Sequence, residues 1–229
     1  MKRILYVLMC LWGAAGLLSC EKTTEGLTGI TYYPVIELNG DTEIIYIGEE
    51  YVEPGYTAVM NGEDITEQVT ITNNIDNTNV GIYTVNYSAV NEQGFSASVS
   101  REVYVISEGS IENLYYAVSN GQDGGIVAIY DNGDGTYLVT DICGGYYSYY
   151  RYPGYDAYGY DFYAEANFTL ADDGTLTQVG DANNWYFGDP SDPSSMENGH
   201  YDETTGEVSW NMAFSGEAFL AVNLYPIEK

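Results

Sequence analysis

The chain has 229 residues, and its 34 acidic side chains outnumber 6 basic ones, giving a formal net charge of −28. A protein this acidic cannot neutralise phosphates, which argues against nucleic-acid binding and against attraction to an anionic membrane surface. Disorder is also disfavoured, because 45% hydrophobic and 15% aromatic residues suffice to build a core.

The N-terminus carries the features of an export signal. Two basic residues precede an apolar run that is too short for a membrane span, which needs about 20 residues. The next residues, Leu17-Leu18-Ser19-Cys20, resemble the lipobox of bacterial lipoproteins, where cleavage before the cysteine is followed by its acylation. This resemblance implies a signal peptide over 1–19, a lipid on Cys20 and a flexible tether over 20–32. An ordinary secretory signal is the alternative.

Once residues 1–19 are removed, Cys143 is the one thiol that carries no lipid. The mature chain then has no internal disulfide and no cysteine-based metal site. Cys143 lies in a strand-like stretch, 140–144, so we expect it to be a small buried hydrophobe.

Alternating apolar and polar residues, punctuated by turn residues, predict an all-β protein with two units. In the first unit, 33–107, the candidate strands are 35–38, 43–47, 69–71, 83–89 and 103–105, which predict a small sandwich. Gly81-x-Tyr83-x-Val85 is typical of a tyrosine corner, with Val85 where an antibody domain has its second cysteine. Without a cysteine pair, we expect apolar packing alone to hold this core.

Several landmarks of the first unit follow one another in a recognisable order. They are Gly48-x-x-Tyr51-x-x-Pro54-Gly55-Tyr56-x-Ala58, Asp64-Ile65-Thr66-x-x-Val69, Val80-Gly81-x-Tyr83-x-Val85-x-Tyr87 and Asn91-x-x-Gly94-x-Ser96-Ala97. Their order is similar to a bacterial Ig-like domain that recurs in surface proteins and lipoproteins of Bacteroidetes. The resemblance implies an N-terminal Ig-like β-sandwich that serves as a spacer or mount and supplies no catalytic residue.

The second unit, 111–229, reads as successive hairpins with glycine at their turns. Strands are predicted at 126–130 and 136–140, at 168–170 and 175–177, and at 208–212 and 219–224. Such a meander closes into a barrel or packs as a sandwich, and both stay open. The turn 131–135 superficially resembles a calcium loop, but glycines stand where ligands are needed, which favours a hairpin turn.

Two motifs of this unit, Asp141-Ile142-Cys143-Gly144-Gly145-Tyr146-Tyr147 and Gly199-His200-Tyr201-Asp202, carry a second resemblance. They resemble the C-terminal β domain that is paired with such Ig-like modules in lipoproteins of polysaccharide-utilisation systems. The resemblance implies that setting for the protein and names no function for the domain.

The most unusual segment is 146–163, in which half of the residues are tyrosine. Tyrosine offers a flat apolar face and a hydroxyl with only two χ angles to immobilise, which suits sugar rings. The candidate ligand-binding residues are Tyr149, Tyr150, Arg151, Tyr152, Tyr155, Asp156, Tyr158 and Trp185. Two other interpretations remain: these rings cover the sheet, with Trp185 plugging the end of the unit, or they form a protein-binding patch.

Enzyme chemistry has little support in the sequence. The single histidine, His200, falls in a predicted turn, and an exposed polar role is favoured over a catalytic one. No carboxylate pair is singled out for glycoside hydrolysis. We therefore expect no catalytic residue, no cofactor and no metal site.

The composition and the two resemblances lead to one expected function. The protein should be an outer-membrane lipoprotein at the cell surface, held to the membrane through its lipid alone, that binds polysaccharide or oligosaccharide. The alternative is a structural subunit that binds a protein partner in an outer-membrane complex, and a glycoside hydrolase ranks third.

Overall fold

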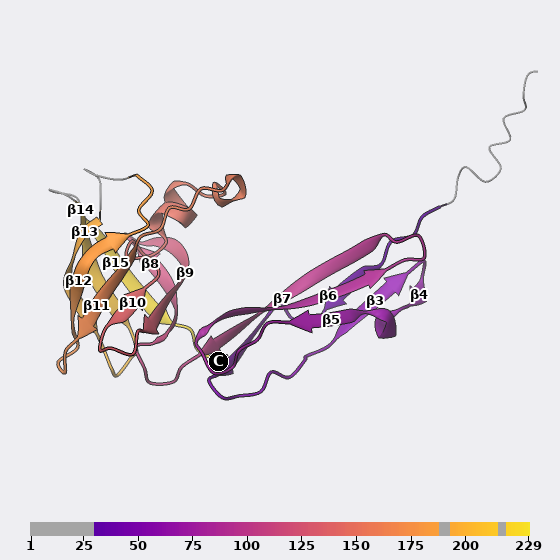
Figure 1. Cartoon of the computed structure of the whole chain (residues 1–229), viewed down its shortest axis with the longest axis horizontal. Helices are drawn as coiled ribbons and strands as arrows, with labels where there is room; N and C mark the ends of the chain where they lie inside the picture. The colour runs from indigo at the N-terminus through magenta and orange to yellow at the C-terminus, as the bar shows by residue number, and fades with distance from the viewer. Residues whose placement is uncertain (1–29, 188–192, 215–218) are drawn as a thin grey trace, which may run out of the picture.

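The computed structural model describes residues 30–187, 193–214 and 219–229. The protein is all-β, as predicted, with two units end to end in Figure 1. No helix in these residues is long and apolar enough to cross a membrane. The predicted signal peptide, Cys20 and most of the predicted tether lie outside the described residues.

The first unit is an Ig-like sandwich of two sheets (Figure 1). One sheet holds β1 (Val35–Leu38), β3 (Tyr56–Met60) and β4 (Glu63–Asp64), and the short turn η1 (Thr66–Gln68) follows β4. The other holds β2 (Thr42–Tyr46), β7 (Ser96–Ile106), β6 (Gly81–Val90) and β5 (Thr70–Asn73), with β2 parallel to β7. Every strand predicted for this unit is present, and β3 and β4 are additional.

The tyrosine corner forms as predicted. The Tyr83 hydroxyl donates a hydrogen bond to the Asn79 carbonyl oxygen at 3.1 Å. Gly81 leaves room for the ring, since a Cβ there would lie 3.2 Å from Tyr83. Val85 is fully buried at the position of the missing cysteine. This corner therefore pins the start of β6 without a disulfide.

The expectation that apolar packing alone holds this core is wrong. Arg101 on β7 is completely buried, and its guanidinium donates to the carbonyl oxygens of Asn39 at 2.8 Å and Gly55 at 3.1 Å. It also lies 3.4 Å from the Glu53 carboxylate and donates to the Tyr87 hydroxyl at 3.2 Å. A buried charge must be paired and hydrogen-bonded, and here one arginine ties both sheets together.

The same network sets the ionisation of the Glu53 carboxyl group. Burial acts to raise its pKa, but hydrogen bonds from the hydroxyls of Tyr87 and Tyr51 and from the Gly55 N–H outweigh burial, so the pKa lies below its usual range. Glu53 therefore stays ionised opposite Arg101.

The second unit is a closed barrel, which decides between the two predicted architectures. Its order is β10-β11-β12-β13-β14-β15-β8-β9. The strands are β8 (Asn113–Ser119), β9 (Gln122–Asp131), β10 (Tyr137–Val139), β11 (Glu165–Leu170), β12 (Thr175–Asn183), β13 (Pro193–Tyr201), β14 (Val208–Phe214) and β15 (Phe219–Pro226). Pairing of β15 with β8, where Val222 faces Ser119, closes the ring.

The predicted hairpins of the barrel are confirmed, with two local corrections. Leu138 pairs with Tyr130 and Thr169 with Thr177, as the turn residues predicted. Cys143 is buried, as expected, but it lies in a turn after β10 rather than in a strand. His200 is exposed, as expected, but it lies in strand β13 and not in a turn.

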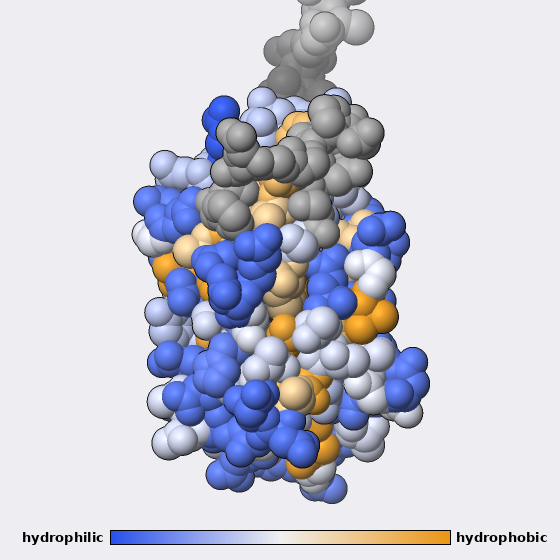
Figure 2. Space-filling model, turned by 90° about the vertical axis from the view of Figure 1, so that its left-hand side faces the viewer, coloured by the Kyte–Doolittle hydropathy of each residue, from blue (hydrophilic) through white to orange (hydrophobic). Residues whose placement is uncertain are grey.

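The end of the molecule that the barrel forms is mainly polar on the face shown in Figure 2. Figure 2 shows mainly hydrophilic residues on the face at the left of Figure 1, with apolar atoms in a narrow, broken column.

The two units meet at a small apolar cluster built around Val80, Ile106 and Leu114, and the Lys229 ammonium pairs with the Glu49 carboxylate across the junction.

Candidate functional site

The tyrosine-rich segment is the long connection between β10 and β11. It contains a π-helical turn, η2 (Tyr146–Arg151), and a 3-10 turn, η3 (Asp156–Tyr158), and it projects from one end of the barrel (Figure 1). Its proline and glycines interrupt regular pairing, as the sequence predicted.

The turn at residues 141–145 fixes the base of this segment to β9. Gly145 has φ of +70°, and a Cβ there would lie 1.6 Å from the Gly124 carbonyl oxygen. A Cβ on Gly124 would in turn lie 1.8 Å from the Gly144 carbonyl oxygen. Only glycine fits this backbone approach, so the segment starts from a rigid base.

Two buried side chains hold the same turn from inside. The Trp210 indole N–H donates to the Ile142 carbonyl oxygen at 2.7 Å. Asp141 accepts the backbone N–H groups of Cys143 at 3.0 Å, Gly145 at 2.7 Å and Ala164 at 3.1 Å. Asp141 therefore joins the two ends of the segment.

The aromatic side chains divide into a packed set and an exposed set. Trp185 packs edge-on against Tyr147 at 5.0 Å between ring centroids and borders the barrel core, as the plug interpretation expected. Tyr152 packs on Phe162 at 4.7 Å, and Arg151 lies over the Tyr152 ring at 5.1 Å. Among the candidate residues the exposed rings are Tyr149, Tyr150, Tyr155 and Tyr158, although Tyr150 and Tyr155 also contact neighbouring rings.

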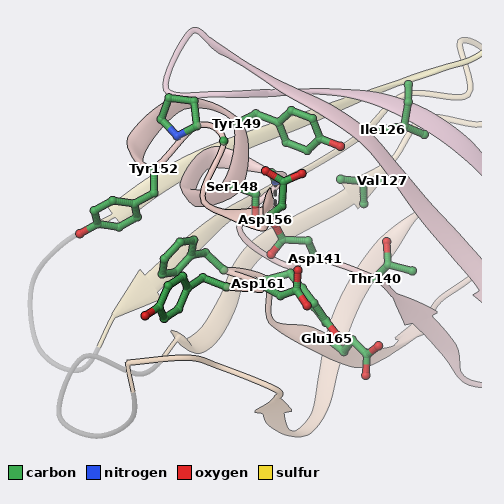
Figure 3. Close-up of a pocket in the computed structure, with 16 residues that line it drawn as sticks. Ile126, Val127, Thr140, Asp141, Ser148, Tyr149, Tyr152, Asp156, Asp161 and Glu165 are labelled. Atoms are coloured by element: carbon green, nitrogen blue, oxygen red, sulfur yellow. Dashed lines mark hydrogen bonds between the residues drawn. The ribbon is translucent and has the colours of Figure 1, made fainter. Parts of the chain in front are cut away.

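A cavity of about 540 Å³ opens beneath the segment (Figure 3). Of the candidate residues, Tyr149, Tyr152 and Asp156 line it. Tyr150, Arg151, Tyr155, Tyr158 and Trp185 are not among its lining residues. Figure 3 shows the carboxyl groups of Asp156, Asp141 and Asp161 in its centre, with Tyr149 above them and Tyr152 to one side.

Sequence reasoning missed much of the lining. Four carboxyl groups line the cavity, those of Asp141, Asp156, Asp161 and Glu165, and no lysine, arginine or histidine does so. Of these, only Asp156 was among the candidate residues, and Asp161 lies in the same tyrosine-rich segment. The Asp-Ile-Cys-Gly-Gly run was a usable signal for Asp141, because paired glycines after an aspartate favour a turn rather than a strand.

Burial raises the pKa of Asp141 to about 6, even though three backbone N–H groups act to lower it. The unfolded value is about 3.9, so the folded protein holds this proton more tightly. Protonation of Asp141 therefore adds to the free energy of unfolding below about pH 4, and this contribution is lost as the pH rises through 6. The loss is about 3 kcal/mol, two pKa units.

The check is urea unfolding of the wild type and Asp141→Asn between pH 3 and pH 8. The wild type should lose about 3 kcal/mol relative to the variant over this range, because asparagine does not titrate. Subtracting the variant removes the contribution of the other acidic groups. Parallel stability curves for the two proteins would contradict the raised pKa.

Among the described residues, no group of three or more His, Cys, Asp or Glu side chains is placed to hold a metal ion. In the turn at 131–135, which resembles a calcium loop, the aspartate side chains accept hydrogen bonds from the backbone of the turn itself. Asp131 accepts the Gly133 N–H at 2.7 Å, and Asp134 accepts the Thr136 N–H at 3.0 Å.

Comparison with known families places this fold. The family model "Bacterial surface protein, Ig-like domain" matches residues 36–105. A second model, described as a C-terminal domain, matches residues 72–226, more than half of the chain. The chain belongs to this C-terminal-domain family. Neither model describes an enzyme.

A solved structure that is similar to this chain comes from another bacterial protein. The lipoprotein BT2262 from Bacteroides thetaiotaomicron is 28% identical, with a TM-score of 0.59, over 84% of this chain and 100% of that one. The present chain, a member of the C-terminal-domain family, therefore shares its fold with a bacterial lipoprotein. A search of curated proteins finds no match.

Two more distant structures come from Clostridium perfringens ZmpB. One, the M60 catalytic domain with CBM51-1 and CBM51-2, is 16% identical with a TM-score of 0.30, over 80% of this chain and 15% of that one. The other, CBM51-2 in complex with GlcNAc and INT domains, is 16% identical with a TM-score of 0.28, over 78% of this chain and 29% of that one.

Proposed function

We propose that this protein is a lipid-anchored cell-envelope protein that binds glycan in the cavity beneath its tyrosine-rich segment. It acts as a non-catalytic accessory protein of a polysaccharide-utilisation system. The observation that carries the proposal is one cavity with aromatic rings on its walls and carboxyl groups at its centre.

The two kinds of side chain match the two faces of a sugar. Tyr149 is 59% exposed, and its ring is held against Gly125, where a Cβ would lie 2.4 Å from it. Such a ring offers a flat apolar face to the C–H groups of a pyranose. Asp156 and Asp161 supply acceptors for hydroxyl groups, and hydrogen bonds to charged groups are about twice as strong as neutral ones.

The charge of the lining selects the class of glycan. Four carboxyl groups and no basic side chain line the cavity, so uronic acids and sulfated sugars would be repelled. The ligand is therefore a neutral polysaccharide or oligosaccharide. Its volume, about 540 Å³, lies within the range of small-molecule sites.

The envelope location rests on the lipobox at Cys20 and on the likeness to a solved lipoprotein. In this arrangement the Ig-like unit is a mount that separates the barrel from the membrane. Digestion of intact cells with protease distinguishes the proposed surface position from the periplasmic face.

Affinity electrophoresis of residues 21–229 through gels with neutral and anionic polysaccharides tests the binding. Retardation by a neutral polymer is expected, and Tyr149→Ala should weaken it about 10- to 100-fold. That range corresponds to the roughly 1.5–3 kcal/mol gained when one large apolar side chain is covered.

Tyr225→Ala is the matched control, because Tyr225 is 41% exposed on the barrel and does not line the cavity. Equal retardation of the wild type and Tyr149→Ala would show that Tyr149 does not contribute to glycan binding. Uniform mobility in every gel would remove glycan binding altogether.

A protein partner is the second candidate function. Tyr150, Tyr155 and Tyr158 are exposed and do not line the cavity, and the exposed Arg151 lies over the Tyr152 ring. Tyrosine and arginine dominate the binding energy of protein interfaces. Co-purification of a stable envelope partner without any bound polysaccharide supports this candidate.

A further inference from the structure

An exposed apolar patch lies at one end of the Ig-like unit. We name it the aromatic tip, and its members are Ile30, Tyr32, Tyr33, Val90 and Phe95, which are between 43% and 72% exposed. Isolated apolar side chains are ordinary on a protein surface, but a contiguous patch marks an interaction site.

The aromatic tip is built by the β6–β7 turn. The buried Asn91 donates from Nδ2 to the Tyr32 carbonyl oxygen at 2.8 Å, and its Oδ1 accepts the Phe95 N–H at 2.8 Å. The rings of Tyr33 and Phe95 lie 5.5 Å apart. One asparagine thus holds the incoming chain and the turn together and brings Tyr32, Tyr33 and Phe95 to the same place, next to Val90 in the chain.

This surface faces the end of the molecule from which the N-terminal chain leaves, opposite the barrel (Figure 1). Ile30 follows Cys20 by ten residues. Ten residues span at most about 35 Å even when fully extended. A lipid on Cys20 would therefore keep the aromatic tip within that distance of the bilayer.

We propose that the aromatic tip rests on the membrane surface and inserts its rings at the level of the lipid headgroups. This inference rests on the lipid anchor of the proposed function, and it adds a second membrane contact to the lipid expected from the sequence. Tyrosine is enriched at membrane interfaces because its ring is apolar and its hydroxyl is polar. Tethering makes the contact intramolecular, so a weak affinity suffices.

The charge of the aromatic tip favours a zwitterionic surface. Residues 30–33 and 90–96 contain no lysine or arginine and one acidic residue, Glu92. An anionic surface would repel this carboxylate. The contact would stand the Ig-like unit upright and hold the barrel, with its cavity, away from the lipid.

The test uses the chain from residue 20 onward, coupled through the Cys20 thiol to a maleimide lipid in phosphatidylcholine vesicles. Cys143 is completely buried and does not react. Val90→Trp places a fluorophore in the aromatic tip, and brominated phosphatidylcholine quenches only indoles that reach the bilayer. We expect brominated lipid to reduce the fluorescence that the introduced tryptophan contributes by at least twofold.

Ile82→Trp is the matched control. Val90 and Ile82 lie on the same face of β6, are 56% and 44% exposed, and are about 26 Å apart along the strand. Quenching of the Ile82→Trp protein should be no greater than that of the protein with only its own tryptophans, Trp185 and Trp210. Adding Tyr33→Ser and Phe95→Ser to Val90→Trp should reduce quenching to that same level.

Equal quenching of the two tryptophan variants on vesicles that carry the protein would overturn the proposal. A dimer in solution that Phe95→Ser dissociates would overturn it too, because a second copy would then cover the patch. Chemical coupling makes the result independent of acylation in the cell and of glycan binding, so failure here leaves the proposed function standing.

Discussion

Replacing Arg101 by methionine is expected to destabilise the Ig-like unit by about 3–5 kcal/mol, the usual cost of breaking a buried ion pair by removing one partner. Methionine fills much of the same volume, so the loss is mainly electrostatic. The carboxylate of Glu53 would keep its place without a cation, the Asn39 carbonyl oxygen would lose the guanidinium donor, and the Gly55 carbonyl oxygen would keep only the Asn39 N–H. Since whole domains are stable by only about 5–15 kcal/mol, the unit would be close to unfolding at 37 °C.

Urea unfolding followed by circular dichroism measures this effect. The tryptophans of the mature chain, Trp185 and Trp210, both lie in the barrel unit, so their fluorescence reports the barrel separately. Arg151→Met is the matched control, because Arg151 is exposed and its loss should change stability by less than about 0.5 kcal/mol. A midpoint for Arg101→Met equal to that of the control would show that the buried network contributes nothing.

Trp210→Ala is expected to destabilise the barrel by about 3–5 kcal/mol, because it leaves a large cavity in the core. Trp210 is 2% exposed, and its indole N–H holds the Ile142 carbonyl oxygen. That carbonyl belongs to the turn from which the tyrosine-rich segment starts. The substitution should therefore also release the segment and weaken ligand binding.

Trp210→Phe separates the two effects. Phenylalanine keeps most of the packing but leaves the Ile142 carbonyl oxygen buried without a donor, at a cost of about 1–3 kcal/mol. Thermal unfolding gives the stability of each variant, and affinity electrophoresis of the folded Trp210→Phe protein gives its binding. Wild-type stability of Trp210→Phe would show that the hydrogen bond does not fix the turn.

The hairpins of both units were predictable because their information is local. A glycine-containing turn and a few alternating residues on either side define each hairpin, as at 131–135 and 172–174, and pairing follows along the chain. The tyrosine corner was predictable for the same reason, since Tyr83 bonds to a carbonyl only four residues before it.

Contacts between distant residues were beyond such reasoning. Closure of the barrel depends on Val222 meeting Ser119, and nothing in either strand specifies the other. Arg101 is an inward-facing charge in an alternating strand. Apart from Tyr87, which is 14 residues away, its partners come from chain segments 46 to 62 residues away. A search for apolar periodicity passes over such a residue.

The candidate site shows the same division. Composition alone singled out residues 146–163, because half of them are tyrosine, but it left open whether the rings bind a ligand, bind a protein or cover the sheet. Which of those rings line a cavity was decided by the fold. The lining comes from β9, the turn at Asp141, the tyrosine-rich segment and the start of β11.

By itself, the sequence determined the all-β class, the two units, the hairpins and the aromatic segment, because local periodicity and turn chemistry specify them. Only the tertiary structure decided the barrel, the buried arginine, the acidic cavity and the aromatic tip at the end of the mount. Each of these brings together side chains from separate strands, and it is the packing of the whole chain that sets their distance and their burial.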